Sequence, residues 1–244
     1  MKKLLLVIMA SVLLLSCNDH DEDMYKNDLV DIATVENPGQ STKFYLNLDN
    51  NERLWTSVSD LRYYRPKDGQ RVIANYVILS NKSDTSTYDH DVQLIDVYEI
   101  LTKGIFRIKP AEQDSIGNDQ IEIRQLWIGS DYLNVEFNYP GYNKIHFISL
   151  VSDSTKTYTD NKIHLEFRHN ANGDYPSYSK WGMASFDLRS LKLNATGDSV
   201  NLVIHTNEYR SPQDNTYNLT YKFNTSSQVS ARKISIPKNA VKAL

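Results

Sequence analysis

The chain has 244 residues, with 27 lysines and arginines against 30 aspartates and glutamates, and a net charge of −3 at pH 7. A mildly acidic chain without a basic cluster argues against nucleic acid as a partner, and one cysteine excludes an internal disulfide. Sixteen tyrosines among many valines, isoleucines and threonines favour β-strands, because these side chains suit a pleated, half-buried surface.

Residues 1–16 have the pattern of a lipoprotein signal peptide. Two lysines follow the first methionine, and residues 4–15 are apolar. This run is shorter than the roughly 20 residues that a membrane-spanning helix needs. It ends in a sequence that resembles a bacterial lipobox, Leu14-Leu15-Ser16-Cys17. We expect Cys17 to become the mature N-terminus and to carry diacylglycerol and an acyl chain such as palmitate, which would anchor the chain to a membrane.

Residues 17–28 are predicted to form an acidic tether. The stretch after the cysteine contains no apolar side chain, Asn18-Asp19-His20-Asp21-Glu22-Asp23, and will therefore be solvated. One interpretation is a plain spacer in an outer-membrane lipoprotein that faces the periplasm. The other is an export address, since an acidic stretch directly after the lipidated cysteine resembles a surface-export signal of Bacteroidetes. We favour the second, which predicts an outer-membrane protein facing the cell surface.

Residues 29–112 are predicted to form a small OB-like barrel. Alternation of apolar and polar residues predicts five short strands, at 44–48, 54–55, 71–80, 92–97 and 105–108. Asp68-Gly69 is a strong turn signal before the third of them. This number of strands in about 70 residues suits a Greek-key barrel of the OB type. The polar stretch 110–119 is predicted to be the domain boundary.

Residues 119–240 are predicted to form an immunoglobulin-like β-sandwich, which makes the fold class all-β. Reversals are marked by Pro140-Gly141 and Asn172-Gly173. Residues 188–193 could form one helical turn. Seven segments alternate in the manner of strands: 121–127, 133–139, 144–152, 162–168, 183–187, 200–206 and 218–223.

Several stretches, in their order and spacing, resemble the NigD-like lipoproteins of Bacteroidetes. These stretches are Asp28–Val35, Phe44–Asp49, Lys67–Tyr76, Leu126–Val135, Leu165–Asn170 and Ser185–Leu188. The resemblance extends from Leu29 to Phe223. It implies an N-terminal OB-type domain and a C-terminal β-sandwich domain. The family is named after a component of a bacteriocin operon and was proposed to confer immunity, but it offers no catalytic residue to carry over.

A cluster of polar residues in the second domain invites a metal-binding interpretation. His164 and Glu166 would share one face of a strand and His169 the other, while His146 and Asp174 could complete a site. The spacing is not that of a helical zinc motif. We favour the alternative, in which these are polar positions on half-exposed strands and in a turn that satisfies its own loop amides. We therefore predict no metal and no other cofactor.

The sequence predicts no catalytic residue. Nucleophilic catalysis requires a serine or cysteine beside a base, and the chain has no Gly-x-Ser-x-Gly. Thirty carboxylates always provide pairs, so no glycosidase geometry can be inferred from them. We predict that the protein is not an enzyme.

Aromatic residues beside the predicted turns are candidate contacts for a ligand: Tyr142, Tyr175, Tyr178 and Trp181. Exposed loop aromatics commonly form binding platforms. The alternative, which the residue types favour, is that they cap the ends of the sandwich core.

Three Asp-Ser sites resemble the O-glycosylation pattern of Bacteroidetes. The candidate acceptors lie in predicted loops or at a strand edge, Ser115, Ser154 and Ser199.

Three functional hypotheses follow from the sequence. The leading one is a lipid-tethered, non-enzymatic module that binds a protein or glycan at the cell envelope, with bacteriocin immunity as one version. The second is an accessory subunit of an outer-membrane complex. The third is a hydrolase, retained only because β-sandwiches can host one.

Overall fold

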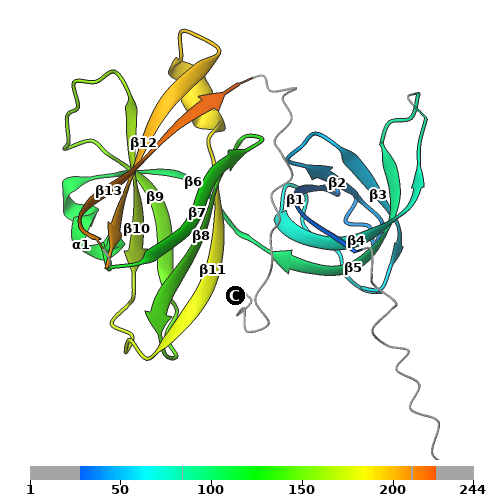
Figure 1. Ribbon diagram of the computed structural model, residues 1–244, viewed down its shortest axis with the longest axis horizontal. Coiled ribbons are helices and arrows are strands. Elements are labelled where there is room, and N and C mark those ends of the chain that lie inside the picture. The colour runs from blue at the N-terminus through cyan, green and yellow to red at the C-terminus, as the bar shows by residue number, and fades with distance from the viewer. Residues whose placement is uncertain (1–27, 84, 210, 224–244) are drawn as a thin grey trace, which may run out of the picture.

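The computed structural model describes residues 28–83, 85–209 and 211–223. They form two all-β units in succession, a barrel and a β-sandwich, as predicted (Figure 1). The predicted signal peptide, Cys17, the tether up to residue 27 and the part of the predicted second domain beyond residue 223 lie outside the described residues.

The first unit is a closed five-stranded barrel. Its strands follow the order β1-β2-β3-β5-β4, and β4 pairs back with β1. Alternate side chains fill the barrel, so that Val72, Ala74 and Tyr76 of β4 are buried, as the two-residue period of a strand requires. Gly69 has a φ of 76° in the turn before β4, a conformation that favours glycine. The strands are β1 (Leu29–Glu36), β2 (Tyr45–Leu48), β3 (Arg53–Ser59), β4 (Arg71–Asn81) and β5 (His90–Glu99).

Strand β6 (Leu101–Ile108) belongs to the second unit, so the predicted first domain, 29–112, extends too far. The barrel instead takes its fifth strand from β1, which the alternation analysis left out. The first half of β6 pairs with β11 (Tyr178–Asp187), and its second half pairs with β9 (Phe147–Asp153). The change of partner falls between Gly104 and Ile105. β6 therefore passes from one layer of the sandwich to the other, as strands do at sandwich corners.

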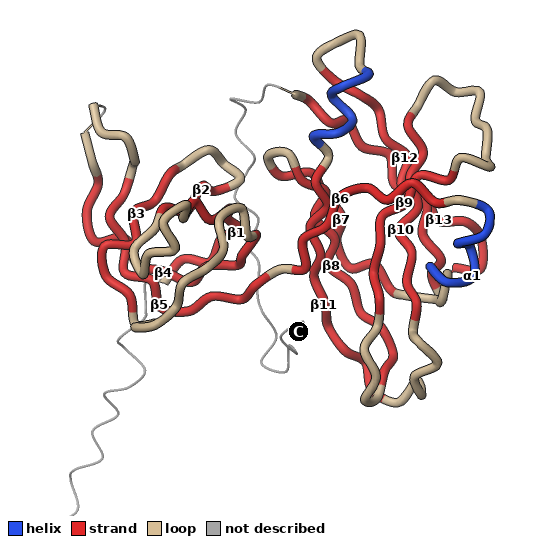
Figure 2. The backbone as a smooth tube through the Cα atoms, turned by 180° about the vertical axis from the view of Figure 1, so that it is seen from behind, coloured by secondary structure: helices blue, strands red, loops and turns tan. Residues whose placement is uncertain are grey.

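The second unit is one eight-stranded sheet, in the order β13-β12-β10-β9-β6-β11-β8-β7, that folds over itself. Figure 2 shows its two layers from behind. Three of its pairings are parallel, whereas immunoglobulin sandwiches are built from antiparallel sheets. The remaining elements are η2 (Pro110–Glu112), α1 (Gln113–Ile116), β7 (Glu122–Gly129), β8 (Tyr132–Gly141), β10 (Ile163–Asn170), η3 (Arg189–Asn194), β12 (Ser199–Glu208) and β13 (Ser211–Lys222).

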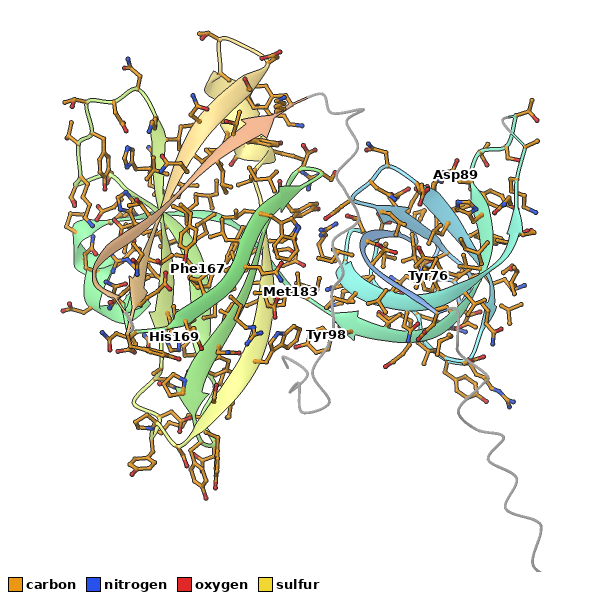
Figure 3. The ribbon with its side chains drawn as sticks, in the orientation of Figure 1. Tyr76, Asp89, Tyr98, Phe167, His169 and Met183 are labelled. Atoms are coloured by element: carbon orange, nitrogen blue, oxygen red, sulfur yellow. The ribbon has the colours of Figure 1, made fainter. Side chains whose placement is uncertain are left out.

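Three phenylalanine rings meet between the two layers. The ring of Phe167 lies 5.5 Å from that of Phe137 and 6.0 Å from that of Phe186, measured between centroids. Figure 3 shows Phe167 inside the sandwich. Tilted and edge-on aromatic contacts of this kind add to the free energy gained by burial.

The polar segment 110–119 covers the outer face of β10 and is not a boundary between domains. Arg168 donates hydrogen bonds to the Gln113 side chain and to the carbonyl of Gly117, both at 3.2 Å, and to Glu166 at 2.7 Å. The side chains of Arg168 and Glu166 are almost fully buried. The polar composition of the segment therefore reflects the buried ion pair that it satisfies.

The barrel and the sandwich share an apolar seam. Figure 3 shows Tyr98 of β5 and Met183 of β11 at the junction between the two units. The rings of Tyr98 and Trp181 meet edge to face, with centroids 5.4 Å apart. The buried residues of the seam are Ile32, Ile73, Tyr98, Ile100, Trp127, Trp181 and Met183.

A buried ion pair lies in the same junction. Arg71, at the start of β4, has a fully buried side chain and donates two hydrogen bonds to the carboxylate of Asp49, at 2.7 and 2.8 Å. It donates a third bond across the junction to Asn134 of β8, at 3.2 Å, and its guanidinium carbon lies 4.4 Å from the ring centroid of Tyr132. Ser185 of β11 in turn donates to Asn134 at 2.6 Å. A charge buried at this depth depends on having every partner in place.

Gly129, the last residue of β7, leaves room for this ion pair. A Cβ atom at this position would lie 2.1 Å from a carboxylate oxygen of Asp49 and 2.9 Å from the side-chain nitrogen of Asn134. Since Arg71 and Asn134 hold the carboxylate of Asp49 in place, the only side chain that fits here is the hydrogen of glycine.

Candidate functional site

Two loops meet at one end of the sandwich and form the surface that we call the tip. They are the β8–β9 loop, 142–146, and the β10–β11 loop, 171–177; we include the strand ends Phe147 and Tyr178. This end lies at the bottom left of Figure 1. Loops on a rigid scaffold are common positions for recognition.

Asp174 ties the two loops of the tip together. Its carboxylate accepts hydrogen bonds from the backbone N–H groups of Tyr142, at 2.5 Å, and Asn143, at 3.2 Å. Lys144 adds bonds in the opposite direction, from its ammonium group to the carbonyls of Asn172 and Gly173 at 3.2 and 2.9 Å. Burial alone would raise the pKa of Asp174, but the N–H groups of the facing loop and the His146 ring together lower it well below its usual range. The carboxylate is therefore a fixed anion at the centre of the tip.

Two histidines continue the network from Asp174 into the sandwich. Nε2 of His146 lies 3.1 Å from Asp174, and Nδ1 of His146 lies 2.8 Å from Nε2 of His169. Nδ1 of His169 lies 3.2 Å from the carbonyl oxygen of Gln120. A carbonyl and a carboxylate can only accept, so Nε2 of His146 and Nδ1 of His169 are the donors at the two ends of this chain of hydrogen bonds. The ring of Tyr139 packs against both imidazoles, at 4.7 and 5.8 Å.

The tip presents apolar side chains to solvent. Tyr142, Tyr175 and Tyr178 are 55%, 73% and 63% exposed, and Ile145 and Phe147 are exposed as well. The rings of Tyr142 and Tyr178 lie 6.3 Å apart. Exposed apolar side chains that gather on one surface typically mark an interaction site.

The structure separates the four aromatic candidates. Tyr142, Tyr175 and Tyr178 lie together at the tip and are exposed, and their role in ligand contact stays a prediction. Trp181 does not, because it is only 5% exposed and packs in the seam, where its indole nitrogen donates to Glu136 at 2.8 Å. Its proximity in sequence to Tyr178 is misleading, since β11 runs from the tip to the seam. Conversely, the sequence did not identify Ile145 and Phe147 as candidate contacts, because both fall in the segment 144–152, whose alternation predicts a strand.

The five residues of the metal-binding interpretation do not form one site: His146, His169 and Asp174 meet beneath the tip, but His164 and Glu166 lie elsewhere. His164 lies at the other end of β10 from His169, with one ring nitrogen 2.9 Å from His205 and the other 2.9 Å from Asp160. Glu166 pairs with Arg168, and with Lys156 at 2.6 Å. Across the described ranges, no group of three or more histidine, cysteine, aspartate or glutamate side chains is placed to hold a metal ion.

The three candidate glycosylation serines lie on different elements of the second unit. Ser115 on α1 and Ser154 after β9 are exposed, whereas Ser199, the first residue of β12, is half-buried. Ser115 and Ser154 donate to the carbonyls of Glu112 and Ile108, at 2.9 and 3.4 Å. The structure thus leaves Ser115 and Ser154 more accessible to a modifying enzyme than Ser199.

Within the part of the chain that the structure describes, no helix has the length and apolar character needed to cross a membrane.

Comparison with protein families gives two matches in succession. Residues 32–100 match the NigD-like N-terminal OB domain, and residues 104–221 match the NigD-like C-terminal beta sandwich domain. The junction between the two matches coincides with the start of β6, where the barrel ends. A search of curated proteins gives no match.

Comparison with solved structures gives relatives of similar length. A protein of unknown function from Bacteroides vulgatus is 29% identical, with a TM-score of 0.72, over 84% of this chain and 96% of that one. A protein from Parabacteroides distasonis described as toxin related is 30% identical, with a TM-score of 0.68, over 81% and 94%. A NigD-like immunity protein from Bacteroides caccae is 20% identical and shares the fold, with a TM-score of 0.63 over 81% and 98%.

The histidine pair makes a prediction about pH. Burial, together with electrostatic interaction with the neighbouring His146, lowers the pKa of His169 below its ordinary value of 6.5. The unfolded chain therefore binds more protons than the folded chain just below pH 6.5, so His169 makes stability fall as the pH decreases from there and has no such effect above it. Imidazole NMR should show the ring of His169 titrating below 6.5. A pKa at or above 6.5 in the folded protein would contradict this environment.

Proposed function

This chain belongs to the NigD-like family, and from that premise we propose that it is a lipid-anchored, non-enzymatic binding module of the outer membrane that engages a protein partner through the tip. The observation that carries the proposal is the group of five exposed apolar side chains, held on loops that Asp174 fixes in place. The loops are already ordered against each other, so association would cost little conformational entropy.

The relatives support a protein partner in preference to a glycan. One is described as an immunity protein and another as toxin related. An immunity function requires recognition of a toxin or of its receptor, both of which the tip could contact at the membrane. The exposed tyrosines suit this role, since tyrosine is enriched among the residues that dominate the energetics of protein interfaces.

We further propose that Cys17 carries the lipid and that the acidic tether directs the protein to the cell surface. Lipidation of Cys17 is supported by the order of a charged start, an apolar run and the closing sequence Leu14-Leu15-Ser16-Cys17. A lipid anchor would confine the module to the envelope and raise its effective concentration near a membrane-bound partner.

An accessory subunit of an outer-membrane complex is the second candidate. The same exposed apolar surface favours it, because a permanent partner would cover the tip. The two differ in stoichiometry: an accessory subunit co-purifies with a membrane partner in equal amount, whereas a recognition module does not.

The tip proposal predicts the effect of two tyrosine substitutions. Photo-crosslinked capture from envelopes of the source organism should recover a partner with the natural chain. Recovery should fall about tenfold or more with the double variant Tyr175→Ala/Tyr178→Ala, since truncating exposed aromatic anchors typically costs 1–2 kcal/mol or more each. Tyr63→Ala is the matched control, because Tyr63 is 91% exposed on the barrel. Equal recovery with both variants, or no partner in growing or stationary cells, would refute the proposal.

The anchor proposal predicts a change of compartment. The natural chain should incorporate labelled palmitate and remain with the membrane fraction. The Cys17→Ser variant should incorporate none and appear in the soluble fraction, since the thiol is the point of attachment. Digestion by a protease added to intact cells tests the surface orientation. An unlabelled natural chain, or a Cys17→Ser variant that stays with the membrane, would disprove lipidation at this residue.

A further inference from the structure

A hollow of about 550 Å³ opens beside the tip, on the end of the sandwich where β8, β10 and β12 finish. Figure 3 marks this end by His169, which contributes to the wall. The volume lies within the range of sites that hold small molecules. The side chains that bear on its chemistry are Asn118, Asp119, Gln120, Pro176, Asn207 and Tyr209.

The segment 118–121 forms one side of the hollow and is fixed to two strands. The backbone N–H of Asp119 donates to the carbonyl of His169, and the carboxylate of Asp119 accepts from the N–H of Ala171, both at 2.7 Å. On the other side, the Asn207 side chain donates to the carbonyl of Asn118 at 2.6 Å. Loop residues therefore provide most of the lining of the hollow, and hydrogen bonds fix the 118–121 segment to the ends of β10 and β12.

The polar side of the hollow consists of amide and carboxylate groups. Asn118, Asp119 and Gln120 are exposed to it. Such groups donate and accept at neighbouring positions, which matches the paired donors and acceptors of adjacent hydroxyl groups.

The apolar side of the hollow consists of ring faces. Pro140, Pro176 and the 38% exposed Tyr209 contribute to it. Flat apolar surface of this kind accepts the C–H face of a pyranose ring, while polar groups at its edge fix the orientation of the ligand.

The charged side chains known to line the hollow are negative. Among the described residues of its lining there is no lysine or arginine, whereas Asp119 and Asp174 both belong to it. Of the described lining residues, the other titratable ones are Tyr209 and His169, and burial lowers the pKa of His169. A carboxylate, sulfate or phosphate would be repelled here.

We propose that the hollow is a binding site for a neutral saccharide unit, whose hydroxyl groups bond to Asn118, Asp119 and Gln120 while its ring packs on Pro176 and Tyr209. This site goes beyond the proposed function, because the partner contact proposed there rests on the exposed tyrosines of the tip, which do not line the hollow. The two surfaces share the 171–177 loop, through Asp174 and Pro176. A glycan bound here would place the tip at a defined point of the envelope, next to a sugar-bearing partner.

The test is an NMR titration of the isotope-labelled mature chain with neutral disaccharides: lactose, maltose, cellobiose and diacetylchitobiose. At least one should give saturable shifts of the Asn118 and Gln120 amides, with a Kd on the order of 1 mM. The Asn118→Ala/Gln120→Ala variant should raise that Kd at least about fivefold, since it removes two hydrogen-bonding groups. Gln125→Ala is the matched control, because Gln125 is exposed on β7 and does not line the hollow.

Three results would overturn the proposal. These are no saturable shift with any neutral disaccharide at about 20 mM, an unchanged Kd in the Asn118→Ala/Gln120→Ala variant, or digalacturonate binding as tightly as the neutral sugars. The Tyr175→Ala/Tyr178→Ala variant should bind the saccharide normally. Failure of the hollow and failure of the tip are therefore separately visible.

Discussion

The ion pair between Arg71 and Asp49 is the constraint on which the arrangement of the two domains depends. It places a fully buried guanidinium between the barrel and the sandwich, with Asn134 and the ring of Tyr132 as partners from the far side. Removing one member of such a pair commonly costs about 3–5 kcal/mol, because the remaining charge stays buried without compensation. Both members of the pair belong to the barrel, and they reach the sandwich through Asn134, which bonds to each of them, and through the ring of Tyr132. These contacts are directional, unlike apolar packing. The apolar seam around Tyr98 and Trp181 packs in the same junction.

The tip is likewise held by a charged side chain with several hydrogen-bond partners. A single carboxylate, Asp174, collects N–H groups from one loop and connects through His146 and His169 to the sandwich. Exposed tyrosines on loops would ordinarily be mobile, and mobility reduces affinity. Here the polar network beneath them fixes the loops and leaves the rings free for contact. A rigid connection between domains and a rigid tip together allow a lipid-tethered protein to present one surface in a constant geometry.

The sequence predicts where most strands lie, since each of the seven segments predicted in the second domain overlaps an observed strand. It does not predict burial as well, because β8 and β10 each contain runs of at least four consecutive buried residues. It cannot predict which domain a strand joins. β6 alternates just as a barrel strand would, and only its pairing with β9 and β11 places it in the sandwich. Likewise, the sequence suggests that Trp181 lies beside a turn. The long strand β11 instead extends from the tip to the seam, where Trp181 is buried. The link between His146, His169 and Asp174 depends on the pairing of β9 with β10, which residue spacing does not reveal. Three of the four tyrosine and tryptophan candidates nevertheless lie together at the tip, because Pro176 lies in the β10–β11 loop and Pro140-Gly141 ends β8 just before the facing loop.

The most direct test of this account is whether the barrel and the sandwich unfold together. Differential scanning calorimetry of the mature chain should show one transition, with a calorimetric enthalpy close to the van't Hoff enthalpy. Gly129→Ala, whose Cβ would displace the Asp49 carboxylate, should lower the midpoint by several degrees or split the transition in two. Gly197→Ala, which meets no atom within 4 Å, should behave like the natural chain. Two well-separated transitions in the natural chain would contradict the claim that the buried ion pair makes the two domains one cooperative unit.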